Sequence, residues 1–266
     1  MLNLYIEHKK HGESFELSQV PIEIKRGEIN LLLGHNGAGK TTIIKSLFGL
    51  MKFQGTLKIS NKLISFDKSS DVDYFKRHVS YISDDIDILD YLSPIEYFSL
   101  MKTTYQNSYN DNLLEHLIKV FELEQYLDHP IANLSHGNKK KTQIVSQLFK
   151  KSDYIIFDEP TNGLDPDMII ILKDVLKILK FHGVGLLIST HNLSFGQDLF
   201  DNLIILRDGH IKLNSNKKEI KKHFSNNNLE YIYKEVNQDY YKNIEGLLNE
   251  INNSSGKKGR NSKIIG

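Results

Sequence analysis

The chain has 266 residues, of which 39% are apolar and 25% charged, with a formal net charge of +1 and no cysteine. This length and composition indicate a globular protein with room for one good-sized domain or two small ones. The near-zero net charge provides no field that would attract nucleic acid, and the lack of cysteine excludes disulfides and thiolate chemistry. The first residues lack a signal-peptide pattern, and no run approaches the roughly 18 apolar residues of a membrane span. We therefore expect a cytosolic protein that meets a membrane only through a partner.

The first part of the chain alternates apolar and polar residues with the period of half-buried strands. This alternation covers residues 2–7, 15–20 and 22–24, and short strands are also predicted at 56–59 and 63–66. Short turns connect these runs, so the strands should pair in antiparallel fashion. The pattern predicts an N-terminal antiparallel β subdomain.

Helical periodicity replaces strand periodicity from about residue 93 to residue 128. Ser93 is followed by proline and then by glutamate, which are the residue types expected at a helix N-cap, first position and first turn. A strand predicted at 79–83 comes just before this segment. We therefore predict a helical subdomain inserted at about residues 85–133.

The second half of the chain returns to an α/β pattern. Buried strands are predicted at 154–157 and 184–188, a helix lies between them at 167–180, and a hairpin is predicted over 202–213. Runs of four or more apolar residues bounded by turn residues are typical of strands covered on both faces. The fold class expected from the whole pattern is α/β.

Regular periodicity fades beyond about residue 224. Runs rich in Asn, Ser, Gly and Lys are typical of linkers and tails, although residues 242–251 could form a short helix. We assign residues 1–223 to one folded domain and residues 224–266 to a partly disordered C-terminal extension. Its basic end is expected to be a free tail rather than a contact with anionic lipid.

A glycine-rich turn joins the apolar run 31–33 to a predicted helix. The turn and the helix start consist of Gly34, His35, Asn36, Gly37, Ala38, Gly39, Lys40, Thr41 and Thr42. Glycines allow the backbone to curl so that successive N–H groups point at phosphate oxygens, and the helix N-terminus adds partial positive charge. Lys40 should reach the β- and γ-phosphates, and the Thr41 hydroxyl should hold Mg²⁺. The turn predicts binding of a nucleoside triphosphate.

Two adjacent carboxylates, Asp158 and Glu159, follow the buried strand at 154–157. In an open parallel sheet, ligands bind beyond the carboxyl ends of the strands, so these side chains should meet the glycine-rich turn. Asp158 is expected near the metal ion. Glu159 is expected to act as the general base for the attacking water.

The order of these motifs resembles the ATP-binding subunits of ABC transporters over roughly residues 1–215. The motifs that carry the resemblance are Gly34–Thr41, Leu134–Asn138, Asp158–Pro160, Gly163–Pro166 and Ser189–His191. The Leu-Ser-x-Gly element separates this family from other phosphate-loop ATPases. The resemblance implies an α/β P-loop ATPase core with an N-terminal antiparallel β subdomain and an inserted helical subdomain. It also implies ATP and Mg²⁺ as ligands, a second ATP-binding subunit and a separately encoded transmembrane permease as partners.

The resemblance implies roles for further residues. Ser135 and Gly137 would form an anion site that faces the γ-phosphate held by the other subunit, so hydrolysis would need a dimer. Asp165 would lie in the loop that couples the two sites, and His191 would contact the γ-phosphate. His11 takes the position of the aromatic residue that stacks on adenine, with Phe15 and Tyr5 as substitutes.

Three positions depart from the family pattern. Asp84 stands where the family has a glutamine that binds Mg²⁺ and senses the permease, and a carboxylate there could still hold the metal. His136 replaces the first glycine of the signature, and Asn138 replaces its glutamine. These changes resemble the branch that contains exporters and self-immunity transporters for antibiotics and peptides.

The function predicted from these motifs is ATP hydrolysis that energises transport, by export of a peptide, drug or antibiotic, on the inner face of the cell membrane. One alternative is a soluble ATPase of the same type that acts on a scaffold outside the membrane. Another is a nucleotide-dependent regulator that hydrolyses ATP weakly, which Asp84 and His136 leave open. The apolar residues of the helical segment could serve as core or as a docking groove for the permease.

Overall fold

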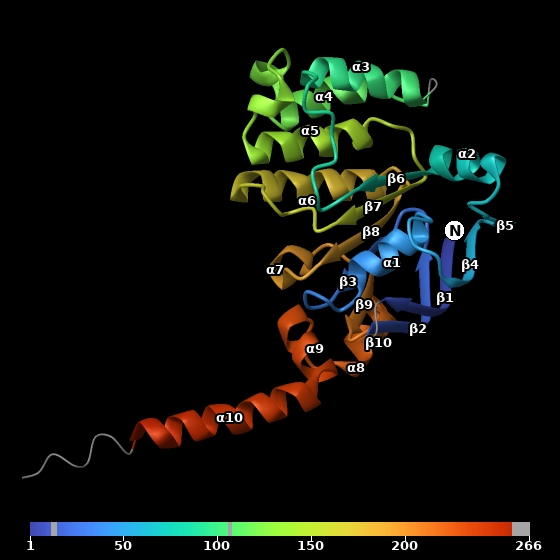
Figure 1. Cartoon of the computed structure of the whole chain (residues 1–266). Coiled ribbons are helices and arrows are strands. Elements are labelled where there is room, and N and C mark those ends of the chain that lie inside the picture. Colours follow the sequence, from blue (N-terminus) through green and yellow to red (C-terminus); the bar gives the residue numbers. More distant parts are fainter. Residues whose placement is uncertain (12–14, 106–107, 257–266) are drawn as a thin grey trace, which may run out of the picture.

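A computed structural model describes residues 1–11, 15–105 and 108–256, and the side chains of His11 and of residues 253–256 lie outside this description. The strands form two sheets (Figure 1). The first is antiparallel, in the order β2-β1-β4-β5. Its strands are β1 (Leu2–His11), β2 (Phe15–Ile24), β4 (Gln54–Ile59) and β5 (Lys62–Leu63). This sheet confirms the N-terminal antiparallel subdomain.

The second sheet has six strands in the order β10-β9-β3-β8-β7-β6. All neighbouring pairs are parallel except β10 with β9, which form a hairpin. The strands are β3 (Ile29–Leu33), β6 (Val79–Ile82), β7 (Tyr154–Asp158), β8 (Gly185–Thr190), β9 (Asn202–Arg207) and β10 (His210–Asn216). Every residue of β3, β7 and β8 is buried, because helices or the other sheet cover both faces.

Alternate residues of the central strands belong to two hydrophobic cores. On one face, Leu32 and Ile156 pack with α1 (Lys40–Leu47), which lies between the two sheets. On the other face, Leu31 and Phe157 pack with α5 (His136–Leu148) and α6 (Pro166–Phe181). The period-2 alternation of strand side chains therefore places α1 and α5 on opposite faces of the sheet.

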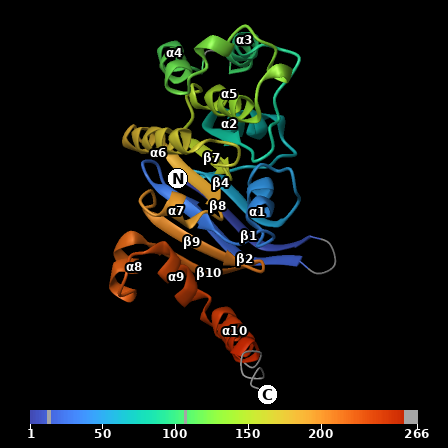
Figure 2. The same ribbon diagram turned by 90° about the vertical axis from the view of Figure 1, so that its left-hand side faces the viewer.

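The segment between β6 and β7 is helical, as the sequence predicted. It contains α3 (Pro94–Tyr105), α4 (Asp111–Val120), two short 3₁₀ turns (Glu124–Tyr126 and Ile131–Asn133) and α5. Ser93 caps α3 by a reciprocal arrangement, since its backbone N–H donates to Glu96 Oε2 at 2.8 Å and the Glu96 backbone N–H donates to Ser93 Oγ at 3.4 Å. Figure 2 shows these helices at the opposite end of the molecule from α10 (Gln238–Gly256).

Two segments differ from the sequence-based prediction. The strand predicted at 63–66 ends at Leu63, because the chain then turns and Phe66 packs beside Gly49 and Phe75. The helix α2 (Ser69–His78), which the sequence analysis did not identify, follows and carries three basic residues in its last turn. The short α7 (Leu193–Gly196) was also missed.

The helix α8 (Lys217–His223) lies just before the predicted C-terminal extension, and the extension itself contains α9 (Leu229–Val236) and α10 (Gln238–Gly256). The prediction of a linker was therefore wrong for residues 229–256, whereas the short helix predicted at 242–251 lies within α10. Asn228, in the run taken for a linker, is the N-cap of α9. Leu229 and Ile232 are fully buried in the core beside Leu31. The tail predicted at 257–266 lies outside the described residues.

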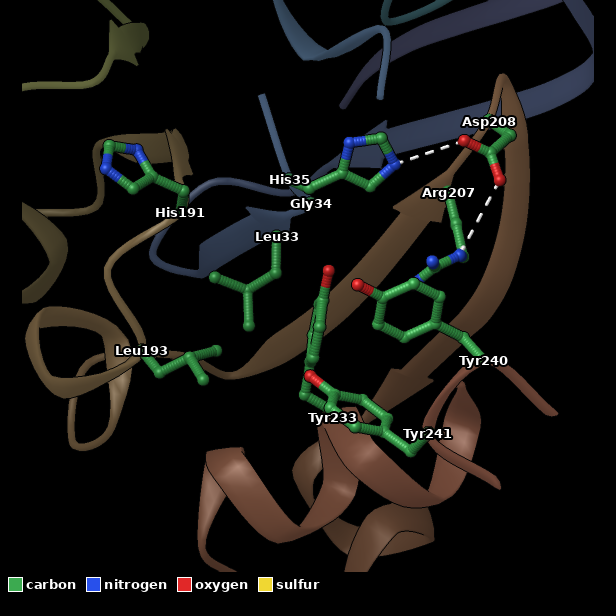
Figure 3. A pocket seen from close by; sticks show the side chains of 10 residues that line it. All are labelled: Leu33, Gly34, His35, His191, Leu193, Arg207, Asp208, Tyr233, Tyr240 and Tyr241. Carbon is green, nitrogen blue, oxygen red and sulfur yellow. Dashed lines mark hydrogen bonds and ion pairs between the residues drawn. The ribbon is translucent and has the colours of Figure 1, made fainter. Parts of the chain in front are cut away.

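The extension also meets the start of the glycine-rich turn (Figure 3). Tyr233, Tyr240 and Tyr241 line a cavity of about 500 Å³ together with His35 and His191. Burial raises the pKa of Tyr233, and a hydrogen bond with the His35 backbone opposes this rise. Among the described residues, no helix is both long and apolar enough to cross a membrane.

Candidate functional site

The glycine-rich turn connects the buried end of β3 to the first residue of α1. Gly39 has φ +111° and precedes Lys40, and a Cβ at this glycine would lie 2.5 Å from the ring of Phe15. Only glycine fits both the backbone angle and the space. Gly39 gives α1 no side-chain cap, and the first turn of α1 has no acidic residue. The N-terminal N–H groups of α1 are therefore suited to an external anion.

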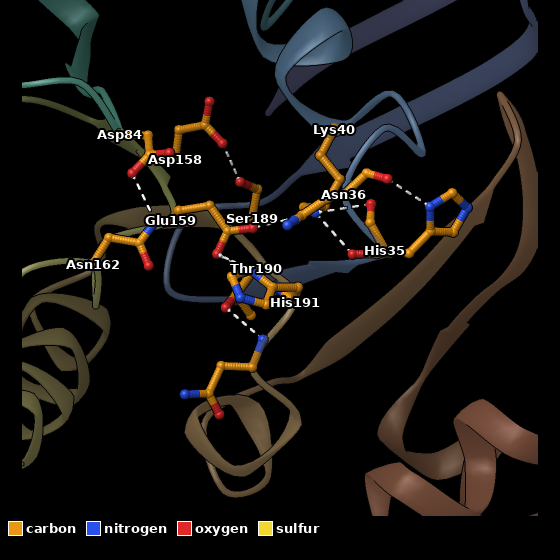
Figure 4. Close-up of polar contacts among 12 residues, drawn as sticks. His35, Asn36, Lys40, Asp84, Asp158, Glu159, Asn162, Ser189, Thr190 and His191 are labelled. Atoms are coloured by element: carbon orange, nitrogen blue, oxygen red, sulfur yellow. Dashed lines mark hydrogen bonds and ion pairs between the residues drawn. The ribbon is translucent and has the colours of Figure 1, made fainter.

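Lys40 is buried at the centre of this turn. Its side chain is 6% exposed, and Nζ donates to the carbonyl oxygens of Gly34 at 2.8 Å and His35 at 3.3 Å. The backbone of the turn thus curls around the ammonium group (Figure 4). A cavity of about 400 Å³ opens beside it. The lining residues are Phe15, His35, Asn36, Gly37, Gly39, Lys40, Thr41, Thr42, Asp84 and Glu159.

Asp158 ends β7 and is 1% exposed. Its Oδ1 accepts a hydrogen bond from the Ser189 hydroxyl, whereas its Oδ2 is buried without a hydrogen-bond partner in the protein. Burial raises the pKa of Asp158, whereas the nearby hydroxyl groups of Ser189 and Thr41 lower it. A buried carboxylate oxygen without a partner is costly, so it calls for water or a cation.

Glu159 has φ +45°, in the left-handed region that is unfavourable for residues other than glycine. Such a conformation costs roughly 1–3 kcal/mol and is often found at functional sites. The Glu159 backbone N–H donates to Ser189 O at 3.0 Å, which anchors the turn to β8. The turn directs the two adjacent carboxylates to different partners.

The carboxylate of Glu159 lies between two cationic or ionisable side chains (Figure 4). Oε1 is 3.2 Å from Lys40 Nζ, at an angle that does not make a hydrogen bond. Oε2 is 3.0 Å from Nδ1 of His191, whose side chain is 47% exposed. The His191 backbone N–H also donates to Oε2 at 3.3 Å. Three elements, α1, β7 and the end of β8, therefore bring together the predicted catalytic residues.

The residues around Asp158 have the chemistry of a magnesium site. The Thr41 hydroxyl and the unpartnered Asp158 Oδ2 are hard oxygen donors, which Mg²⁺ prefers. No cluster of at least three His, Cys, Asp or Glu side chains suited to a metal occurs in the part of the chain that the structure describes. The donors present fit an ion that takes most of its ligands from water and substrate phosphates.

Asp84, the third predicted metal ligand, lies at the edge of the same cavity. One of its oxygens, Oδ1, accepts a hydrogen bond from Nδ2 of Asn162 at 2.8 Å. The sequence analysis assigned no role to Asn162 or to Ser189. The position of each, next to a motif residue at a strand end, is the signal that could have identified it.

Three predicted nucleotide contacts lie outside this cavity. Ser135 is the N-cap of α5, where its hydroxyl accepts from Asn138 N at 3.2 Å. Gly137 follows in the first turn of the same helix, and Asp165 caps α6 by accepting from Met168 N at 2.9 Å. Because α5 and α1 cover opposite faces of the sheet, one subunit does not bring Ser135 to its own Lys40.

The predicted adenine-stacking residue, His11, ends β1, and its side chain lies outside the described residues. Phe15, one of the two substitutes, lines the cavity and contacts Gly39. Tyr5, the other substitute, hydrogen-bonds to Gln19 and does not line the cavity. Of the two substitutes, Phe15 is therefore the one that lies at the phosphate-loop cavity.

Known proteins resemble this chain over most of its length. The profile of the family described as ABC transporter matches residues 17–162. The uncharacterised ABC transporter ATP-binding protein YhaQ of Bacillus subtilis is 27% identical over 263 residues, which cover 96% of this chain and 85% of that protein. The glutamate/aspartate import ATP-binding protein GltL of Escherichia coli is 28% identical over 221 residues, which cover 82% and 91%. A solved structure of an ATP-binding subunit of an ABC transporter has a TM-score of 0.79 at 28% identity, covering 89% of this chain and 99% of that one.

Proposed function

Because the chain belongs to the family of ABC transporter ATP-binding subunits, which bind and hydrolyse ATP, we propose that it energises transport through a separately encoded permease. The observation that carries this proposal is the arrangement of Lys40, Glu159 and His191 at the carboxyl ends of neighbouring strands. A cation that can stabilise phosphate charge (Lys40), a candidate base (Glu159) and a candidate switch residue (His191) thus lie together beside a phosphate loop.

In the proposed mechanism the backbone from Gly34 to Thr42 and the N-terminus of α1 bind the phosphates of ATP. Lys40 moves from the carbonyl oxygens of the turn to the β- and γ-phosphates, where it stabilises the charge of the transferring group. Mg²⁺, held by Thr41 and Asp158 with Asp84 nearby, would neutralise phosphate charge when bound. Phe15 lies beside the adenine, in a stacking role predicted for His11.

Glu159 orients and deprotonates the attacking water. Its Oε2 already faces His191 Nδ1, so the imidazole can fix the carboxylate and reach the γ-phosphate with its exposed edge. The strained backbone of Glu159 keeps this carboxylate apart from that of Asp158. Two adjacent carboxylates can then serve water activation and metal binding separately.

A second ATP-binding subunit, identical or different, would complete the site. Ser135 is exposed at the start of α5, away from the cavity of its own chain. The helix N-terminus and the Ser135 hydroxyl can bind the γ-phosphate of ATP held by the other subunit. Gly137 and Asp165 would contact the same interface.

The permease would dock in a groove of about 720 Å³ between α2, β6 and the helical insertion. Tyr81, Met101 and Tyr105 provide apolar surface in this groove. Lys76 and Arg77, in the last turn of α2, give it a basic edge. Apolar surface with a basic edge suits a short amphipathic helix with acidic residues. The chain would thereby lie at the inner face of the cell membrane.

For the direction of transport we propose export of a peptide, drug or antibiotic, which the departures at Asp84 and His136 support. Import is the second candidate, because GltL, a relative at 28% identity, is named as an import protein. Inside-out membrane vesicles that contain the assembled transporter separate the two directions. ATP-dependent uptake of cargo into such vesicles indicates export, and uptake only into right-side-out vesicles indicates import.

The test of the whole proposal is affinity isolation of the full chain from detergent-solubilised native membranes, followed by mass spectrometry. We expect a stoichiometric polytopic membrane protein, and we expect a Lys76→Glu/Arg77→Glu variant to lose it while retaining ATPase activity. A Lys217→Glu/Lys218→Glu variant, with charges reversed on α8, is the matched control. Recovery of soluble partners alone would instead support the scaffold ATPase, and absent ATPase activity would support the weakly hydrolysing regulator.

A further inference from the structure

Two of the three departures from the family pattern, Asp84 and His136, contact the same loop of the molecule. Asp84 Oδ1 accepts a hydrogen bond from Asn162 Nδ2 at 2.8 Å. The imidazole of His136 covers Gly163, where an added Cβ would lie 2.4 Å from His136 Cδ2. The neighbouring loop residues Asn162 and Gly163 are thus in contact with Asp84 and His136, respectively.

Both Asp84 and His136 are connected to α5. Nζ of Lys140, whose side chain is fully buried, donates to Ser83 O at 2.7 Å and Asp84 O at 2.9 Å. Nε2 of Gln143 donates to Ser83 Oγ at 2.9 Å and Asp85 O at 2.8 Å. His136 is the first residue of the same helix. Asp84 and His136 therefore form a rigid frame with α5.

The loop that they hold connects directly to Glu159. The Asn162 backbone N–H donates to Glu159 O at 3.2 Å, which closes a tight turn. Glu159 at the start of this turn has the unfavourable φ of +45°. A conformation of this kind persists only where surrounding contacts enforce it. Contacts that fix Asn162 consequently also fix the direction of the Glu159 carboxylate.

We propose that Asp84 and His136 are positioning residues that hold the Asn162–Gly163 loop and so keep Glu159 aligned for water activation. In this role the Asp84 carboxylate acts as a hydrogen-bond acceptor for Asn162, and its charge is not required. The imidazole of His136 closes the loop from the side of α5. This inference rests on the proposed role of Glu159 as the base.

An exchange of the two side chains tests the Asp84 contact. Asp84→Asn retains an acceptor for Asn162 and should keep kcat within about threefold of the wild type, whereas Asp84→Ala should lower kcat roughly tenfold to a hundredfold. Asn162→Asp places two carboxylates against each other and should also lower kcat. The double variant Asp84→Asn/Asn162→Asp restores the hydrogen bond in reverse and should recover most of the activity. KM for ATP and the Mg²⁺ concentration for half-maximal rate should stay unchanged throughout.

Two results would contradict the positioning role of Asp84. If Asp84→Asn loses as much activity as Asp84→Ala, and the double variant does not recover, then the charge of Asp84 matters and the positioning role is wrong. A raised Mg²⁺ requirement in Asp84→Asn would likewise assign Asp84 to the metal. Glu159→Gln, measured in parallel, separates a failure of the base assignment from a failure of the positioning role.

The His136 contact is tested by His136→Ala, with Lys139→Ala on the next turn as the matched control. Lys139 lies near the same loop but makes none of the contacts described above. We expect His136→Ala to lower kcat severalfold in steady-state kinetics while the KM for ATP stays constant, and Lys139→Ala to change neither. Equal effects of the two variants, or a change confined to KM, would overturn the role of His136.

Discussion

Nδ1 of His191 lies 3.0 Å from Oε2 of Glu159, so the proposed base and the proposed switch residue are paired. The other oxygen of Glu159 lies 3.2 Å from Nζ of Lys40. Both Lys40 and Glu159 are almost fully buried, and His191 alone of the three is largely exposed. In the proposed mechanism ATP would draw Lys40 to its phosphates, and Glu159 would then keep its contact with His191 and have room beside Oε1 for a water molecule.

Replacement of Glu159 by Gln should abolish turnover but preserve ATP binding. The amide cannot accept the proton of water, and general base catalysis contributes about 10²–10⁴-fold to a rate. We expect a comparable loss in kcat, with an ATP dissociation constant close to that of the wild type. Phosphate release and equilibrium nucleotide binding measure the two quantities, and undiminished hydrolysis would exclude Glu159 as the base.

Replacement of His191 by Ala should lower kcat roughly a hundredfold, because Glu159 then loses the partner of its Oε2 atom. The same truncation at His210, an exposed histidine on β10, is the control and should leave kcat unchanged. Steady-state kinetics separate this effect from a change in ATP affinity. A variant whose KM alone rises would show that His191 binds the substrate without aiding the chemical step.

Replacement of Phe15 by Ala should weaken ATP binding about tenfold, since stacking of a base on an aromatic side chain contributes roughly 1–3 kcal/mol. Tyr5→Ala is the matched control, because Tyr5 does not line the phosphate-loop cavity. Equilibrium binding of ATP and of inorganic triphosphate, measured for both variants, should distinguish a stacking role of Phe15 from a role in supporting the loop. Only ATP should bind more weakly to the Phe15 variant, and equal losses for both ligands would mean that Phe15 merely supports the loop.

Replacement of Ile232 by Ala should lower the free energy of unfolding by about 2–5 kcal/mol, as for other large-to-small changes in cores. Ile232 is fully buried, and it joins α9 to the core that includes Leu31. Leu248→Ala on α10 is the control, because Leu248 is 55% exposed. Urea denaturation measures both variants, and equal stabilities would show that the extension does not fold with the ATPase core.

Lys150 should make the protein more stable as the pH rises above neutrality. Burial lowers the pKa of Lys150 to about 8, from 10.5 in an unfolded chain. Between these values the unfolded chain binds more protons than the folded one, so the free energy of unfolding increases with pH, by at most about 3 kcal/mol. Urea denaturation at about pH 7.5 and 9.5 measures the increase, which the matched variant Lys150→Met should lack.

The comparison of wild type with Lys150→Met must be made below about pH 10, where tyrosines of the unfolded chain begin to ionise. Burial raises the pKa of Tyr81 and Tyr105 near the same groove. A tyrosine whose pKa is raised by folding lowers the free energy of unfolding only where the unfolded tyrosine ionises, which happens above about pH 10. An equal pH dependence in the wild type and in Lys150→Met would assign the effect to another group.

The sequence by itself determined the elements whose chemistry is local. The turn from Gly34 to Thr41, the buried strand before Asp158 and the cap at Ser93 each depend on neighbouring residues, because backbone angles, strand period and capping act over a few positions. The same local signals allowed the parallel core and the helical insertion to be predicted. They also gave the residue types of the phosphate, metal and base positions.

Only the tertiary structure decided which distant residues meet. Asp84 and Asn162 are 78 positions apart, and no periodic pattern links them. The burial of Leu229 and Ile232 depends on a surface formed by β3 and α7, so a segment with weak periodicity still folds onto the core. The separation of Ser135 from Lys40 follows from the opposite faces of one sheet. Contacts of this kind arise from packing of whole elements, which sequence spacing does not specify.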